Sequence, residues 1–375
     1  MHLVNTLKKT LPVLLLAAAP ASAVQINLID IGGVNGSAAE QGFQIAANYW
    51  ESVLTNDAVL NFNVGYASLG ADILGSTKSN SFKDVDIGSY YSLLNATQSS
   101  ALDAQAVANL SPLTPNGSVD VTVPEYFDPN TLSGVAEVGS RTAPDNTPIS
   151  GTMAISSANI KALVGGFEDV VDGEINFSSD FAFDFDPTDG ISGGMYDFIG
   201  VAIHEMAHAL GFLSSAQDFD YNTGTDFPVD DYWWGYSSDM FRYSAPGVLD
   251  WTFDTDSYFS LDAGATAYMD GYFSTGAVNG DASQASHWKK NYTCTDFLGI
   301  MNPYTCDGFG TNVSALDLAL LDAIGWDTNV DITSNPNYLK SSANIYFDAV
   351  PEPSVLALMF AGLIGLFGVS RRRQS

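Results

Sequence analysis

The chain contains 375 residues and is strongly acidic, with 43 Asp and Glu against 13 Lys and Arg and a formal net charge of −30 at pH 7. Such a surface repels polyanions, so nucleic acid and anionic membrane surfaces are excluded as expected partners. The acidity suits solubility at high salt or cation binding, and the length allows one large domain or two lobes.

The first 23 residues are predicted to be a removable signal peptide. A basic pair at 8–9 precedes a short apolar stretch at 11–19, and an A-x-A cleavage site follows at 21–23. The apolar stretch is too short for a membrane-spanning helix. We therefore expect export and a mature chain that begins at Val24.

The mature chain opens with a strand, a helix and a second strand. Residues 25–31 and 59–69 show the alternation of strands, and residues 38–54 place apolar side chains on one side of a helix. This spacing predicts an α/β unit. Further along, the sequence predicts a helix at 90–110, a short strand at 119–123, a short helix at 157–163, a strand or hairpin at 174–185, and a helix at 314–324 that begins with a capping box. Segments 112–147 and 214–286 are rich in turn residues, and 327–349 has the composition of a polar spacer.

Three aspartates, Asp184, Asp186 and Asp189, precede Gly190. Carboxylates this close together are a candidate Ca²⁺ site, although their spacing departs from the EF-hand pattern. Aspartate beside glycine also caps turns, and we favour a capped turn here.

Three histidines lie outside the signal peptide, and two of them, His204 and His208, form an HExxH motif around Glu205. The helix that carries the motif should begin near residue 196 or 197 and end at Gly211, since glycine commonly ends helices. Imidazoles at i and i+4 point the same way and can bind one zinc ion. The glutamate between them can then act as general base on a zinc-bound water, so the motif predicts hydrolysis of peptide bonds.

The third zinc ligand is not adjacent to the motif. No glutamate follows Glu205 before the C-terminal tail, and Ser214 occupies the last position of the longer HExxHxxGxxH motif. Asp218 or Asp220 could serve. We favour His287, because imidazole is the more common ligand in such sites.

Two further groups of residues have structural and functional interpretations. Trp233, Trp234 and Tyr236 could line a wall of a substrate cleft, and we favour a role as core or loop anchors. Cys294 and Cys306 are the two cysteines of an exported chain, which predicts a disulfide. Free thiols and zinc ligation are the alternatives.

The C-terminal end carries three features in order. Pro351-Glu352-Pro353 precedes an almost uncharged run at 355–369, and three arginines follow at 371–373. At ~1.5 Å per residue the run spans roughly 23 Å, short of the ~30 Å hydrocarbon core of a bilayer. A permanent transmembrane tail anchor is one interpretation. The order of features closely resembles a PEP-CTERM sorting signal, which we favour. That resemblance implies a Gram-negative bacterium, transient inner-membrane association through the tail, an exosortase-type processing enzyme, and delivery to the outer surface or extracellular matrix.

The HExxH motif with Gly211, the long interval to His287 and the later Met301-Asn302-Pro303 together resemble the leishmanolysin arrangement of the metzincin zinc proteases. The resemblance implies that His287 is the third zinc ligand and that Met301 is the methionine of a turn beneath the metal. In some metzincins a nearby tyrosine stabilises the transition state, and Tyr304 is a candidate for that role or for plain packing. The strand at 177–185 would be the edge strand that pairs with an extended substrate.

The sequence therefore predicts an α+β, metzincin-like fold with an N-terminal α/β lobe at 24–213, which includes the active-site helix. A mostly irregular C-terminal lobe at 214–327, closed by a helix, would supply the third ligand. A spacer at 328–349 and a sorting tail at 350–375 would follow. The predicted function is a secreted zinc endopeptidase acting on protein or peptide substrates. The alternative is a non-catalytic surface or matrix-binding protein with a vestigial zinc site.

Overall fold

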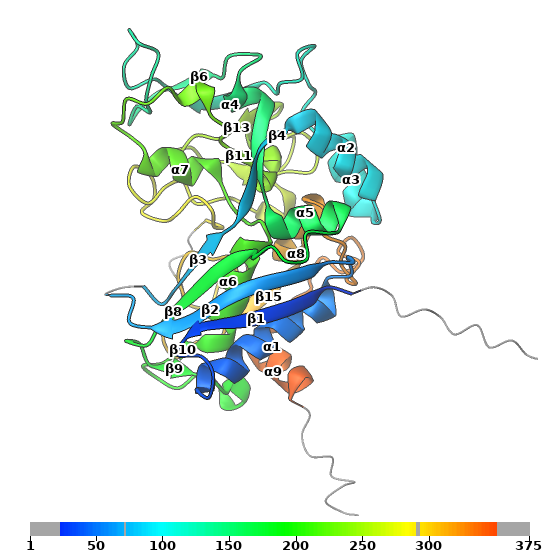
Figure 1. The fold of residues 1–375 in the computed structure, drawn as a ribbon, viewed down its shortest axis with the longest axis vertical. Coiled ribbons are helices and arrows are strands. Elements are labelled where there is room, and N and C mark those ends of the chain that lie inside the picture. The colour runs from blue at the N-terminus through cyan, green and yellow to red at the C-terminus, as the bar shows by residue number, and fades with distance from the viewer. Residues whose placement is uncertain (1–22, 71–72, 290–292, 351–375) are drawn as a thin grey trace, which may run out of the picture.

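The computed structural model of the protein describes residues 23–70, 73–289 and 293–350. The signal peptide, apart from its last residue, and the predicted tail helix lie outside the described residues. Within the described ranges, no helix is both long and apolar enough to cross a membrane. These ranges form a mixed α and β structure with several sheets, which confirms the predicted α+β class (Figure 1).

A four-stranded sheet forms the lower part of the molecule in Figure 1. Its order is β1 (Gln25–Gly32), β2 (Val59–Ala67), β8 (Gly173–Ser178) and β3 (Gly75–Ser79). The first three strands are parallel, whereas β3 runs antiparallel to β8 and ends the sheet. Parallel neighbours need a crossover connection, and α1 (Ala38–Val53) supplies it between β1 and β2.

Helix α1 packs against α6 (Phe198–Leu210), the helix that carries the HExxH motif. Trp50 of α1 is fully buried, and its indole N–H donates to the Ile203 carbonyl of α6 at 3.2 Å. Phe43 of α1 meets Phe198 edge to face, with ring centroids 5.2 Å apart. Burying each such side chain stabilises the fold by about 1.5–3 kcal/mol, so these contacts fix the position of α6.

The other elements are short. The remaining strands are β4 (Ser81–Asp86), β5 (Val121–Pro124), β6 (Ser140–Thr142), β7 (Thr152–Ser156), β9 (Phe183–Asp184), β10 (Tyr196–Asp197), β11 (Gly235–Tyr236), β12 (Arg242–Ala245), β13 (Val248–Asp250), β14 (Tyr258–Phe259), β15 (Asn312–Ser314) and β16 (Leu339–Ser341). The remaining helices are α2 (Ile87–Thr97), α3 (Ala101–Ala108), α4 (Pro148–Gly151), α5 (Ser157–Val164), α7 (Ser215–Tyr221), α8 (Ala315–Ala323) and α9 (Ser342–Ala349), with 3₁₀ turns η1 (Pro187–Asp189), η2 (Val229–Asp231), η3 (Ser237–Phe241) and η4 (Tyr268–Asp270).

The upper part of Figure 1 includes two further sheets, of order β11-β7-β4 and β14-β12-β13-β5-β6. β4 follows β3 almost directly, so one extended stretch of chain connects the lower sheet to the upper part. β5 and β6 precede α6 in the sequence and share a sheet with β12–β14, which follow it. The segments 24–213 and 214–327 therefore interleave in space, and the second contributes strands where mostly irregular chain was predicted.

Three predicted elements differ in the structure. The helix expected at 90–110 is divided into α2 and α3, because Ser100 begins the second helix with a capping box to Asp103. The hairpin considered at 174–185 is wrong, since β8 ends at Ser178 and β9 pairs in parallel with β10. The segment expected to be a polar spacer carries β16 and α9, and α9 packs against α1.

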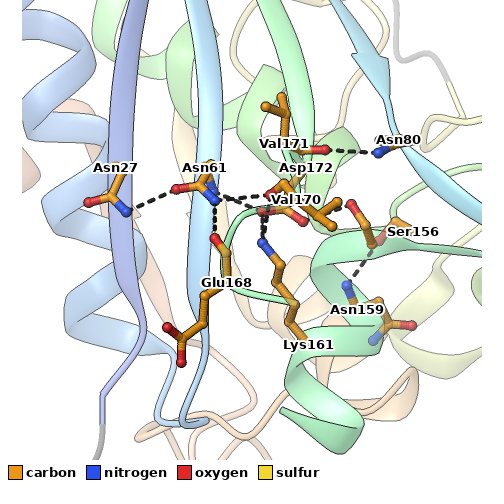
Figure 2. A network of polar contacts seen from close by, with 11 residues as sticks. Asn27, Asn61, Asn80, Ser156, Asn159, Lys161, Glu168, Val170, Val171 and Asp172 are labelled. Atoms are coloured by element: carbon orange, nitrogen blue, oxygen red, sulfur yellow. Dashed lines mark hydrogen bonds and ion pairs between the residues drawn. The ribbon is translucent and has the colours of Figure 1, made fainter. Parts of the chain in front are cut away.

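A buried ion pair joins α5 to the segment that leads into β8 (Figure 2). Lys161 Nζ lies 2.6 Å from Asp172 Oδ2, and both side chains are fully buried. The same Oδ2 accepts from the backbone N–H of Asn61 in β2 at 2.8 Å, and Asp172 Oδ1 accepts from the Ser157 hydroxyl at 2.7 Å. Lys161 also donates to the Val170 carbonyl at 2.8 Å. The network therefore fixes β2 and β8 relative to α5.

Candidate metal centre

Capping interactions fix both ends of α6. Buried Asp197 caps the first turn by accepting from the Gly200 amide at 3.0 Å. The same carboxylate accepts from the Thr311 amide at 3.0 Å and hydroxyl at 2.8 Å. Gly211 follows the last turn with a φ of 121°, a conformation that favours glycine. The helix thus begins and ends where the sequence predicts.

Three histidine rings meet beside α6. His204 and His208 extend from the helix, and His287 lies far downstream in the chain. His287 Nε2 lies 3.1 Å from His204 Nε2 and 3.1 Å from His208 Nε2. In the part of the chain that the structure describes, no other set of three or more His, Cys, Asp or Glu side chains has its ligand atoms so close together.

A backbone carbonyl orients each of these rings. The Nδ1 atoms of His204, His208 and His287 lie 2.7, 2.8 and 3.2 Å from the carbonyl oxygens of Ile300, Phe212 and Gln284. A carbonyl only accepts, so each Nδ1 of a neutral ring carries the proton and each Nε2 keeps its lone pair. Three lone pairs that converge in this way repel one another unless a cation lies between them.

The donor set fits zinc. Tetrahedral Zn²⁺ with Zn–N bonds of ~2.0–2.1 Å separates its nitrogen ligands by about 3.3 Å, close to the 3.1 Å seen here. Burial lowers the pKa of His204 to about 4 and that of His208 to about 3. Burial, reinforced by the other two histidines, also holds the pKa of His287 well below its usual value. All three rings are therefore neutral at neutral pH, as metal ligation requires.

Glu205 lies on the same helix with its carboxylate against β3. The residue is 7% exposed, and burial raises the pKa of its carboxyl to about 7, while a hydrogen bond from Thr77 lowers it. The Thr77 hydroxyl lies 2.8 Å from Glu205 Oε2 and 2.9 Å from the Glu205 backbone oxygen. Gly75 leaves room for the carboxylate, since a Cβ there would lie 3.1 Å from Oε1.

A cleft of about 610 Å³ contains the three histidines and Glu205. One side is formed by residues 73–77 of β3 and the turn before it. Part-buried aromatic rings line it elsewhere, namely Phe181, Tyr196, Phe297 and Tyr304. Among the residues that the structure describes, Glu205 is the one carboxylate that lines the cleft, and no Lys or Arg lines it. The described lining is therefore nearly uncharged in a strongly acidic protein.

The edge strand at this cleft is not the predicted one. β8, which includes Phe177, lies inside the sheet between β2 and β3. β3 is the terminal strand of that sheet and borders the cleft. The strand was missed in the sequence because Gly, Ser, Thr and Lys in β3 give no apolar alternation.

The aspartates considered as ligands have other partners. Asp218 accepts from the Tyr236 hydroxyl at 2.7 Å. Asp220 accepts from the amides of Val278 and Asn279, both at 2.8 Å, and so holds the segment that leads to His287. Neither belongs to the group of close ligand atoms.

The remaining predicted residues are also placed. Asp184 and Asp186 accept from backbone amides two residues ahead, at 3.1 Å each, in the manner of a capped turn, and Asp189 lies in the adjoining η1. None of the three belongs to the group of close ligand atoms, so nothing in their geometry supports a Ca²⁺ site. Trp234 stacks between Phe219 and Phe227 with ring centroids 4.4 and 5.5 Å apart. Trp233, Trp234 and Tyr236 do not line the cleft, as expected for anchors.

The predicted disulfide between Cys294 and Cys306 is confirmed. The loop that it closes carries Met301, which is fully buried, and Tyr304, which lines the cleft and meets Phe297 edge to face at 5.6 Å. The structure thus brings His204, Glu205, His208, His287 and Tyr304 to one cleft. The roles of Met301 beneath a metal and of Tyr304 in a reaction remain predictions.

Comparison with known proteins identifies the tail. Residues 349–373 match the PEP-CTERM protein-sorting motif. The motif implies export, processing by an exosortase-type enzyme and sorting to the surface of a Gram-negative bacterium. No curated protein and no solved structure matches the chain.

Proposed function

We propose that the protein is a surface-sorted, zinc-dependent endopeptidase with His204, His208 and His287 as the metal ligands. The observation that carries this proposal is the convergence of three Nε2 lone pairs beside a buried glutamate, with His287 Nε2 at 3.1 Å from each of the other two. Carbonyl contacts orient all three rings toward one another, as expected of a built ligand set.

A metzincin-type architecture accounts for the chain order of these parts. The HExxH helix lies beside a sheet that ends in an antiparallel strand, and the third histidine follows a long interval. The segment with Met301 then returns to the site, where the Met301 carbonyl accepts from the Trp288 amide at 2.9 Å. We assign Met301 to the turn beneath the metal on this basis, in the leishmanolysin-like arrangement that the motifs resemble.

The chemistry follows from the positions of the side chains. Zinc bound by the three imidazoles would polarise a water molecule and the scissile carbonyl. Glu205 accepts the proton that the attacking water loses and passes it to the departing amine. The Thr77 hydroxyl orients that carboxylate, and burial keeps its pKa near 7, so it can both take and release a proton at neutral pH.

An extended peptide is the substrate that this cleft suits best. β3 is the terminal strand of its sheet and contributes residues 75–77 to the cleft lining, so its outer edge could pair with a peptide strand. Pairing with backbone atoms gives affinity with little dependence on sequence, which suits a general endopeptidase. Tyr304 lines the cleft, and we assign it a supporting role in transition-state stabilisation.

Replacing Glu205 with glutamine tests this function. We expect Glu205→Gln to keep one zinc per chain, because the glutamate is not a ligand, and to lose at least ~100-fold in cleavage of casein. Glu174→Gln is the matched control, since this exposed glutamate lies on the neighbouring strand β8. Undiminished cleavage by Glu205→Gln would refute the mechanism. The non-catalytic alternative would be favoured if the wild type binds zinc and a matrix polymer but cleaves no peptide in a broad library.

A further inference from the structure

Asp317 is a buried carboxylate that joins three separate segments around the candidate metal centre. It lies in the first turn of α8 and is 1% exposed. Its Oδ2 accepts from the Ser314 amide at 2.7 Å, the Ser314 hydroxyl at 2.9 Å and the Ile300 amide at 2.9 Å. Its Oδ1 accepts from the Trp288 indole N–H at 2.8 Å and the Met301 amide at 3.3 Å. The carboxylate therefore does more than cap its own helix.

Two of these partners are directly connected to metal ligands. Trp288 is the next residue after His287, so its indole contact fixes the backbone that carries the third ligand. Ile300 presents its carbonyl to His204 Nδ1 at 2.7 Å while its amide donates to Asp317. Asp317 thus fixes a ligand on α6 and a ligand from the distant segment through one side chain.

The surroundings of Asp317 are closely fitted to a carboxylate. Gly299 passes so near that a Cβ there would lie 2.2 Å from Oδ2 and 2.5 Å from Oδ1. All five contacts come from N–H or O–H donors, which suits a group that only accepts. An asparagine has nearly the same shape, and its NH₂ group would face either the Trp288 and Met301 donors or the Ile300 and Ser314 donors.

We propose that Asp317 is a positioning residue of the metal centre, which sets the geometry of His204 and His287 through Ile300 and Trp288. The proposal rests on the zinc centre proposed above. Partners that orient metal ligands typically contribute about 10–100-fold in metal affinity. A carboxylate that served only as a helix cap would change the stability of the protein and leave its affinity for zinc in the folded state unchanged.

The test is the affinity for zinc alone, measured by competition with a chromogenic chelator at a temperature at which circular dichroism shows each metal-free variant folded. Asp317→Asn should bind zinc about 10–100-fold more weakly than the wild type. Its cobalt(II) form should show an altered visible absorption spectrum, because the ligand geometry changes. Asp322→Asn is the matched control, since Asp322 is a buried carboxylate on the same helix that faces Ser100 instead. This control should keep wild-type affinity.

Equal affinities for Asp317→Asn and the wild type, or equal losses in Asp317→Asn and Asp322→Asn, would overturn the proposal. If Asp317→Asn does not fold, Trp288→Phe carries the test, because it removes the indole donor and retains an aromatic ring. We then expect zinc affinity to fall about fivefold, the equivalent of one hydrogen bond, and wild-type affinity would overturn the proposal. A wild type that binds no zinc would instead refute the metal centre itself, so the two failures are distinguishable.

Discussion

Replacing Lys161 with methionine should strongly destabilise the protein while leaving every residue of the cleft in place. Lys161 and Asp172 form a fully buried ion pair at 2.6 Å, and methionine fills a similar volume without the charge. Removing one partner of a buried pair leaves the other charge without compensation, which costs about 3–5 kcal/mol. The Asn61 amide and Ser157 hydroxyl still donate to Asp172, at 2.8 and 2.7 Å, so the lower end of that range applies.

We therefore expect Lys161→Met to lower the free energy of unfolding by about 3 kcal/mol. At about 2.1 cal/mol/K of unfolding entropy per residue, that corresponds in a chain of this size to a fall in Tm of roughly 4–5 °C. Asp172→Asn should lower the free energy of unfolding by at least as much. The buried Lys161 ammonium would still donate to the Val170 carbonyl at 2.8 Å, but it would lose the negative charge of Asp172. The double variant should lose about 2 kcal/mol less unfolding free energy than the two single variants lose together, since each single change leaves one unpaired charge.

Urea unfolding followed by circular dichroism measures these differences, provided that the slope of the transition is unchanged. Lys340→Met is the control, because Lys340 forms an exposed pair with Asp348, and such pairs contribute about 0–1 kcal/mol. A Lys161→Met variant within about 1 kcal/mol of the wild type, or no more destabilised than Lys340→Met, would refute the reasoning.

Two further predictions concern the site and the pH dependence of stability. Thr77→Val should retain zinc and lose about 10–100-fold in cleavage rate, which is the contribution of one hydrogen bond to a charged group. Thr77→Ser keeps the hydroxyl and should retain most of the wild-type rate. A loss in Thr77→Ser as large as in Thr77→Val would show that the hydroxyl is not the cause. Burial raises the pKa of Asp322 to about 8, with the nearby charge of Asp103 adding to the effect. The folded state then holds a proton that the unfolded chain releases near pH ~4, so this group makes stability fall as pH rises from about 4 to about 8. Asp322→Asn should reduce that fall by a few kcal/mol, measured as the free energy of unfolding from urea titrations at pH ~5 and ~8, and a pH dependence equal to that of the wild type would contradict this prediction.

The sequence predicted the parts of the site that depend on local spacing. The positions of His204 and His208 on one helix follow from the i, i+4 relation, and the end of that helix follows from Gly211. His287 could be selected because few ligand types remain in a chain so poor in histidine. The geometry now supports that choice, since Asp218 and Asp220 bind other groups.

The parts that were missed depend on tertiary contacts. β3 has no apolar alternation, because one side of it faces the cleft and Glu205, so its role as the edge strand could not be read from periodicity. Asp317 belongs to the capping box that begins the helix predicted at 314–324, and such a box is a local signal. Its hydrogen-bond partners Trp288 and Ile300 lie 29 and 17 positions away in the sequence, and no local sequence pattern predicts such pairs.

The position of the sorting tail relative to the site has a functional consequence. The sorting motif begins at residue 349, where α9 ends, and α9 packs against α1, η1 and α6. The three candidate ligand histidines lie upstream of that point, in residues that the structure describes. Glu205, Thr77 and Asp317 do so as well. Removal of the tail beyond the Pro-Glu-Pro sequence therefore deletes no part of the proposed catalytic machinery. We therefore expect sorting and the proposed catalysis to be separable, because the processed protein keeps every residue of the proposed site.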